Sequence, residues 1–233
     1  MKRLIVSILA AAMMAATFAS CGPGNASESS SVAVNNATEP DTKDKNGVGY
    51  KVHSDKTATV TQVDKNASKI VIPEKLDDKK VTRLSKSVFK MSKADTITLP
   101  DSIESISEYA FAFCRNLKSV NLPEGIKSIG QNSFTACESL KQITIPSTVR
   151  AIDIFSFDAS GLETVTIPKS VKDVRGFAFA DCENLKEVVF EGDSTQIEEK
   201  AFNNSDNVTI VAKADSEAMD YAKENNIKHK IIK

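Results

Sequence analysis

A period of about 23 residues is the feature that most constrains what this chain can fold into. Three consecutive segments follow it, namely 117–139, 140–161 and 162–184, with one residue missing after Ser160. Segments 94–116 and 185–207 fit the same frame more loosely. Internal periods of about 20 to 50 residues are typical of solenoids, in which each unit packs on its neighbours. The sequence therefore predicts one stacked domain.

Each unit divides into a strand-like part and a turn-like part. The pattern L-x-x-V-x-L-P alternates apolar and polar residues, which predicts a short strand that ends at the proline. The pattern A/S-F-x-x-C-x-x-L brings Phe, Cys and Leu inward at the spacing of a helical turn. The recurring phenylalanines are Phe111, Phe134, Phe157, Phe179 and Phe202. One unit cannot bury its apolar side alone, so the units are expected to stack.

The two ends of the array differ from the repeat. Residues 48–63 alternate in hydropathy and predict an amphipathic hairpin that covers the first unit. Asp215 or Ser216 can cap a helix that runs to about Glu224, and a last strand follows it. We therefore predict a repeat solenoid of the α+β class with about seven rungs, an N-terminal β-hairpin cap and a C-terminal helix-strand cap.

The N-terminus has the pattern of an export signal. Lys2 and Arg3 precede an apolar run of about 15 residues, which is too short for a membrane span. Ala19-Ser20-Cys21 follows and resembles a bacterial lipobox, which implies cleavage after residue 20 and acylation of Cys21. Ordinary cleavage near Ala19, with Cys21 unmodified, is the alternative. Residues 21–47 are mostly small and polar and predict a flexible linker, which leaves 48–233 as the repeat domain.

The repeat columns closely resemble those of BspA-type leucine-rich repeats, L-x-x-I-x-L-P…V-x-x-I…A-F-x-x-C-x-x-L, over about residues 48–233. With the lipobox, the resemblance implies a bacterial surface lipoprotein. Several proteins with such repeats are adhesins for host matrix proteins or other bacteria. We expect a lipid anchor at Cys21 that holds the chain to the cell envelope, in the outer membrane. Whether the array faces the cell surface or the periplasm stays open.

Few residues have the spacing that catalysis or metal binding needs. Cys114, Cys137 and Cys182 share one column, in which only Cys114 and Cys137 are close enough to bridge, and we interpret the column as core packing. No C-x-x-C pair or nearby histidine suggests a metal site. His53 and His229 lie in the end segments without a recognisable triad. We predict no catalytic residue, cofactor or enzymatic activity.

The charge is nearly balanced, with a formal net charge of −1, which gives no electrostatic drive toward nucleic acid. Solenoids commonly bind partners on an extended face. Polar residues at the outward positions of the strands form the candidate binding face: Thr98, Ser119, Asn121, Gln142, Thr144, Thr164 and Thr166. The scarcity of aromatic residues on this face favours a protein ligand over a glycan.

The predicted function is a membrane-anchored, exported, non-catalytic protein-interaction or adhesion module. The alternative is a glycan-binding or structural periplasmic lipoprotein of the cell envelope. We expect a monomer, because the two predicted caps oppose end-to-end stacking.

Overall fold

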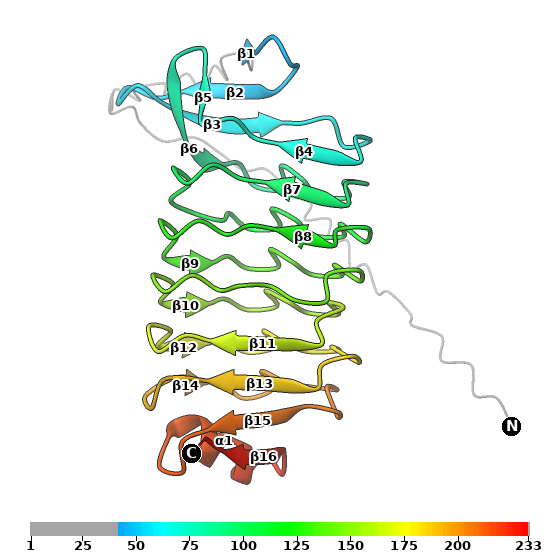
Figure 1. Cartoon of the computed structure of the whole chain (residues 1–233), viewed down its shortest axis with the longest axis vertical. Coiled ribbons are helices and arrows are strands. Elements are labelled where there is room, and N and C mark those ends of the chain that lie inside the picture. The colour runs from blue at the N-terminus through cyan, green and yellow to red at the C-terminus, as the bar shows by residue number, and fades with distance from the viewer. Residues whose placement is uncertain (1–41, 233) are drawn as a thin grey trace, which may run out of the picture. The chain divides into compact units, whose positions relative to one another are not determined.

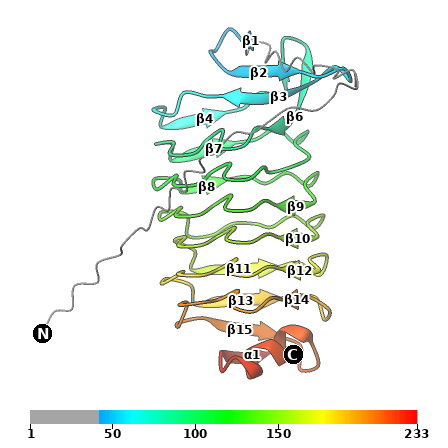
Figure 2. The ribbon, with the colours of Figure 1, turned by 180° about the vertical axis from the view of Figure 1, so that it is seen from behind.

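The computed structural model describes residues 42–232, which form a β-solenoid of about eight turns (Figure 1). One face carries short parallel strands, stacked one above another in Figure 1: β4 (Lys69–Val71), β7 (Thr96–Thr98), β8 (Ser119–Val120), β11 (Thr164–Ile167), β13 (Glu187–Phe190), β15 (Thr209–Ala212) and β16 (Lys228–Ile231). A second face carries β9 (Ser128–Ile129), β10 (Ala151–Ile152), β12 (Asp173–Val174) and β14 (Gln196–Ile197). Figure 2 shows the same stack from behind.

A five-stranded sheet lies at the N-terminal end of the stack, in the order β1-β2-β3-β6-β5. Its strands are β1 (Thr42–Lys43), β2 (Gly49–Val52), β3 (Thr57–Gln62), β5 (Lys75–Leu76) and β6 (Lys79–Leu84). β2 and β3 form the antiparallel hairpin expected in residues 48–63, and β3 pairs in parallel with β6. β1 lies in the stretch 21–47, for which the sequence predicted a linker, and pairs with β2. That this sheet protects the end of the stack remains a prediction.

The C-terminal end has the expected helix and strand. The hydroxyl of Ser216 caps α1 (Glu217–Glu224) by accepting a hydrogen bond from the backbone N–H of Met219, and the helix buries Ala218, Met219 and Ala222. β16 pairs in parallel with β15 over four residues. It therefore continues the ladder as a further turn, which explains why the structure has about eight turns and the sequence predicted seven.

Stacked phenylalanine rings run through the core. Phe111 and Phe134 lie 4.8 Å apart between ring centroids with nearly parallel planes, and the series extends from Phe89 to Phe202 at spacings of up to 5.4 Å. Face-to-face spacing near 5 Å matches the distance between neighbouring strands, so one ring per turn fills the stack. The phenylalanine column of the sequence is thus confirmed as core, with Phe89 as an additional member.

The stretch around each phenylalanine is not the helical turn that its spacing suggested. The N–H of Phe111 donates to the carbonyl of Ser133 in the next turn, whereas the N–H of Ala112 donates within its own turn to Tyr109. This alternation requires a left-handed backbone at two positions per turn, as at Tyr109 and Phe113 with φ of 56° and 60°. The segment thereby exchanges helical hydrogen bonds for bonds between turns.

Candidate functional site

The parallel ladder on the strand face is interrupted in the middle of the stack. β4, β7 and β8 form one sheet and β11, β13, β15 and β16 another, with Gln142–Ile145 between them. Among residues 42–232, none makes a hydrogen bond with the backbone or side chain of these four residues. We call Gln142–Ile145 the open segment. The sequence predicted a paired strand here, because LKQITIP matches the other units, and that prediction is wrong.

The open segment belongs to the turn that is one residue short. Gly161, which closes this turn, donates to the carbonyl of Cys137, whereas Ser139 in the preceding turn donates to that of Arg115. Cys137 lies three residues before Leu140, whereas Arg115 lies two residues before Leu117. The acceptor carbonyl has therefore shifted by one residue. On the opposite face, β10 of the same turn still pairs with β9 and β12. The gap is therefore confined to the strand face of this turn.

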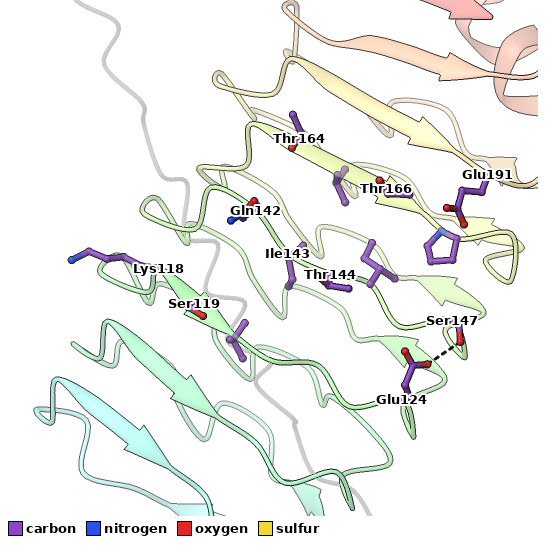
Figure 3. Close-up of a pocket in the computed structure, with 14 residues that line it drawn as sticks. Lys118, Ser119, Glu124, Gln142, Ile143, Thr144, Ser147, Thr164, Thr166 and Glu191 are labelled. Atoms are coloured by element: carbon purple, nitrogen blue, oxygen red, sulfur yellow. Dashed lines mark hydrogen bonds between the residues drawn. The ribbon is translucent and has the colours of Figure 1, made fainter. Parts of the chain in front are cut away.

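A groove of about 680 Å³ lies over the open segment, and we call it the sheet groove (Figure 3). Its lining comes from three successive turns and from the loop after β13: Lys118, Ser119, Val120, Glu124, Gln142, Ile143, Thr144, Ile145, Ser147, Thr164, Val165, Thr166, Pro168 and Glu191. In Figure 3, Gln142 and Thr144 lie between Ser119 of β8 and the two threonines of β11. The strand face is therefore hollowed at this point.

Five of the seven predicted face residues line the sheet groove, and all five are exposed to solvent: Ser119, Gln142, Thr144, Thr164 and Thr166. Thr98 lies on the same face, one turn beyond the lining. The structure thus brings most of the predicted face into one concavity. Whether these residues bind a ligand stays a prediction.

Asn121, the seventh predicted residue, uses its amide in hydrogen bonds within the stack. Its Nδ2 donates to the carbonyl of Leu99 at 2.8 Å, and its Oδ1 accepts from the N–H of Leu99 at 2.8 Å. The amide therefore takes the place of a backbone partner, because the β7–β8 ladder ends at Val120. Asn121 holds the edge of the sheet directly above the gap.

Charges mark the two ends of the sheet groove. Lys118 lies at the end where the strands begin, 3.1 Å from Asp95, and Glu124 and Glu191 lie at the other end (Figure 3). Glu124 also accepts a hydrogen bond from the hydroxyl of Ser147 at 2.9 Å. The groove therefore has an anionic end, whereas the lysine at its other end is paired with Asp95.

Another carboxylate, just outside the lining, bridges two lysines across successive turns. Glu163 lies 3.0 Å from Lys186 and 3.2 Å from Lys141. The hydrogen bond from Lys186, followed by that from Lys141, holds the pKa of Glu163 below its ordinary value. In the repeat, Glu163 takes the position that is lysine in three other units, at Lys118, Lys141 and Lys186, and it pairs with the last two.

The carboxylate end of the groove was not predicted from the sequence. Glu124 and Ser147 each follow the proline that ends the strand, and Glu191 occupies the proline position itself, directly after Phe190. These residues could have been found by extending the strand pattern one or two residues past its last apolar residue. They were missed because residues after a strand need not face the same side as the strand.

The cysteine column belongs to the core, as predicted. Cys114, Cys137 and Cys182 are free and buried, and each thiol donates to a phenylalanine carbonyl of an earlier turn. Burial raises the pKa of Cys114 and of Cys182 to about 11, and that of Cys137 well above its ordinary value. Cys21 lies outside the described residues.

The two histidines lie at opposite ends of the stack. His53 follows β2 and has its Nε2 2.7 Å from the hydroxyl of Thr59, and His229 lies in β16. In the part of the chain that the structure describes, no cluster of His, Cys, Asp and Glu side chains could hold a metal ion. Over the same residues, no helix is long and apolar enough to cross a membrane.

Comparison with known proteins supports the repeat assignment. The model of the BspA type leucine rich repeat region matches six copies over residues 82–209. A leucine-rich repeat protein from Bacteroides ovatus is 26% identical with a TM-score of 0.63, over 70% of this chain and 45% of its own. This chain therefore spans less than half the length of that relative. No curated protein matches the chain.

Two further structures share the fold at lower identity. The leucine-rich repeat protein of T. pallidum is 20% identical with a TM-score of 0.56, over 82% of this chain and 98% of its own. The pneumococcal vaccine antigen PcpA is 20% identical with a TM-score of 0.64, over 81% and 47%. Proteins of this repeat family are generally not enzymes. The family model covers more than half of the sequence, and the chain belongs to the BspA-type leucine-rich repeat family.

Proposed function

We propose that this protein is a membrane-anchored, exported, non-catalytic module that binds a partner protein in the sheet groove. The observation that carries the proposal is the convergence of Ser119, Gln142, Thr144, Thr164 and Thr166 on one concavity. Repeat solenoids form extended surfaces of this kind for binding. Polar side chains without fixed partners can adapt to a ligand, and the hydroxyls and amide of this groove are of that type.

The chemistry of the groove favours a protein over a glycan. Of the fourteen described residues that line it, none is aromatic, whereas sugar rings usually stack on aromatic side chains. Aliphatic residues on its floor and charges at its ends suit a peptide surface better. A glycan ligand, or a structural role in the periplasm, remains the alternative and is tested by the same experiment.

The binding test uses the full chain, purified and presented to host matrix proteins and to a glycan array. The groove variant replaces Gln142 and Thr144 with lysine, which places two bulky charges over the open segment. The matched control replaces Thr209 and Val211 with lysine on β15, at the equivalent positions of the same face but outside the groove. We expect the groove variant alone to lose a protein ligand, and equal loss in both variants would move the site elsewhere.

Attachment at Cys21 and exposure at the cell surface form the second part of the proposal. The lipobox-like sequence at Ala19-Ser20-Cys21 supports the anchor, and the outer membrane is the proposed location. Cys21→Ser should release the chain from the membrane fraction. Protease treatment of intact cells should digest the repeats, and digestion only after lysis would instead favour the periplasmic alternative.

A further inference from the structure

We propose that a pocket at the C-terminal end of the stack binds a neutral saccharide unit. The pocket lies between residues 199–208 of the last turns and residues 221–228, and its volume is about 360 Å³. We call it the end pocket. Small-molecule sites usually have volumes of about 300–1,000 Å³, so the end pocket has the size of a small one. It shares no residue with the sheet groove and can bind a ligand whichever partner the groove takes.

Backbone N–H groups without an acceptor point along the stack toward the end pocket. In the preceding turn, the N–H groups of Phe177 and Phe179 donate to the carbonyls of Lys200 and Ala201. The equivalent donors of the last such turn belong to Lys200 and Phe202, and α1 follows in place of a further turn of this kind (Figure 1). Within residues 42–232 neither N–H has a hydrogen-bond partner, and both residues line the pocket. Because no further phenylalanine turn lies against them, a ligand can accept from these donors.

Tyr221 supplies an aromatic wall of the end pocket. Its partly buried ring makes a tilted contact with Phe202, with 6.1 Å between the ring centroids. Burial raises the pKa of the Tyr221 hydroxyl, and the nearby N–H groups of Phe202 and Ala201 oppose this shift, so the hydroxyl lies beside the unpaired donors. Sugar rings usually stack on aromatic side chains. The sheet groove has no aromatic residue in its described lining, whereas the end pocket has two.

Polar side chains surround the aromatic wall. Asn203, Asp206 and Asn226 line the pocket, and within residues 42–232 their side chains have no hydrogen-bond partner. An amide offers both donors and an acceptor, and a carboxylate offers acceptors. A sugar hydroxyl donates and accepts, so it can bond to either group and to the unpaired backbone donors. The lining therefore matches a ligand that carries several hydroxyl groups.

The charges around the end pocket cancel. Lys200 and Lys228 contribute two positive charges, and Glu199 and Asp206 contribute two negative charges. A charged ligand would meet a side chain of its own sign, whereas a neutral ligand would not. The balance favours a neutral saccharide over an acidic sugar or a basic peptide.

The experiment titrates the isotopically labelled full chain with methyl glycosides of glucose, galactose, mannose and N-acetylglucosamine. We expect at least one of them to bind with a dissociation constant of about 1–10 mM, as suits a small and partly open site. The amide resonances of Lys200 and Phe202 should shift during the titration. Those of Phe111 and Phe134, whose N–H groups are paired within the stack, should not.

Side-chain variants test the polar contacts. Replacement of both Asn203 and Asp206 with alanine should weaken glycoside binding at least about tenfold, because two hydrogen bonds are lost. Glu183→Ala is the matched control, since Glu183 has the position of Asp206 in the preceding turn and lies outside the pocket. It should leave the affinity within about twofold.

Asn226→Gly is a second test that does not depend on the stability of the double variant. Asn226 has a left-handed backbone with φ of 55°, which glycine adopts without strain. The variant removes one amide and should weaken glycoside binding about threefold or more.

Three results would overturn the proposal: no glycoside shifts a resonance, the shifts are confined to Gln142–Ile145, or Glu183→Ala loses as much affinity as the double variant. The lysine variant of Gln142 and Thr144 separates the end pocket from the proposed function. We expect it to lose a protein ligand of the sheet groove and to keep glycoside binding. If it loses glycoside binding, the saccharide binds in the sheet groove and the end pocket is not the site.

Discussion

Asp158 is a carboxylate whose surroundings oppose its ionisation. Burial is the main cause, followed by the negative charge of Asp181, and together they raise the pKa of Asp158 to about 6. The folded protein therefore holds this proton at a pH where the unfolded chain has released it. The contribution of Asp158 to stability is greatest below about pH 4 and is lost as the pH rises through about 6.

Asp158→Asn should remove this pH dependence. We expect the variant to match the parent near pH 4 and to exceed its free energy of unfolding at pH 7 by about 1–2 kcal/mol, allowing for solvent screening. Urea denaturation at both pH values measures the difference. Asp173→Asn, at an exposed carboxylate, is the matched control. A stability difference that does not vary with pH would contradict the assignment.

Of the glycines in the described part of the chain, Gly161 has the most crowded surroundings. A Cβ atom at this position would lie 2.0 Å from the carbonyl oxygen of Glu138, so Gly161→Ala must displace backbone. We expect it to lower the free energy of unfolding by about 3 kcal/mol. Gly176→Ala, whose Cβ would have neighbours no closer than 3.4 Å, should cost less than about 1 kcal/mol. Comparable losses in the two variants would show that the crowding at Gly161 relaxes without cost.

At the level of strands, Asn121 links the last paired residues of one sheet to the start of the gap. Its amide replaces two backbone hydrogen bonds of Leu99, and beyond Val120 the chain leaves the ladder. A side chain can imitate a strand neighbour in this way because the amide carries both a donor and an acceptor. The edge above the sheet groove is therefore fixed by one residue.

Asn121→Ala should destabilise the protein by about 2 kcal/mol, because both peptide groups of Leu99 lose their partner. Asn207→Ala removes a single exposed bond to the carbonyl of Glu183, at 3.1 Å, and should cost about 0.5 kcal/mol. Denaturation midpoints give the energies, and faster hydrogen exchange at the amide of Leu99 gives the location. An unchanged exchange rate would mean that the backbone of the next turn can replace the amide.

Most of the strand pattern could be predicted because it is local. The aliphatic columns, the phenylalanine column and the cap at Ser216 each follow from residues within one unit or one helix turn. The open segment could not be predicted, because LKQITIP has the same pattern as its paired neighbours. Pairing there depends on the spacing between neighbouring turns, which the pattern within one unit does not contain. For the same reason, five site residues were predicted without the groove that gathers them.

Across the stack, stability depends on contacts between neighbouring turns. Phe134 lies between Phe111 at 4.8 Å and Phe157 at 5.3 Å and is fully buried. Phe202 has one stacked neighbour, Phe179, and on its other side a tilted contact with Tyr221 at 6.1 Å. In a repeat array each turn contributes through the interfaces on its two sides, so position along the stack affects the cost of a substitution.

Phe134→Ala should therefore be more costly than Phe202→Ala, although both remove the same group. We expect losses of about 4 kcal/mol and about 2 kcal/mol respectively, because a central cavity disturbs two interfaces and relaxes less. Thermal and urea unfolding of the two variants measure the difference. Equal losses would indicate that the array unfolds as one unit in which position has no effect.

Chemical modification of the buried thiols reports which turns of the stack open first. Only the thiolate reacts with an alkylating reagent, and burial keeps these three groups protonated and enclosed until the surrounding turns separate. Cys114, Cys137 and Cys182 occupy three different levels between the hairpin and the helix. The order in which they become modified during mild destabilisation would reveal whether the array frays from one terminus, from both, or from the gap at its centre.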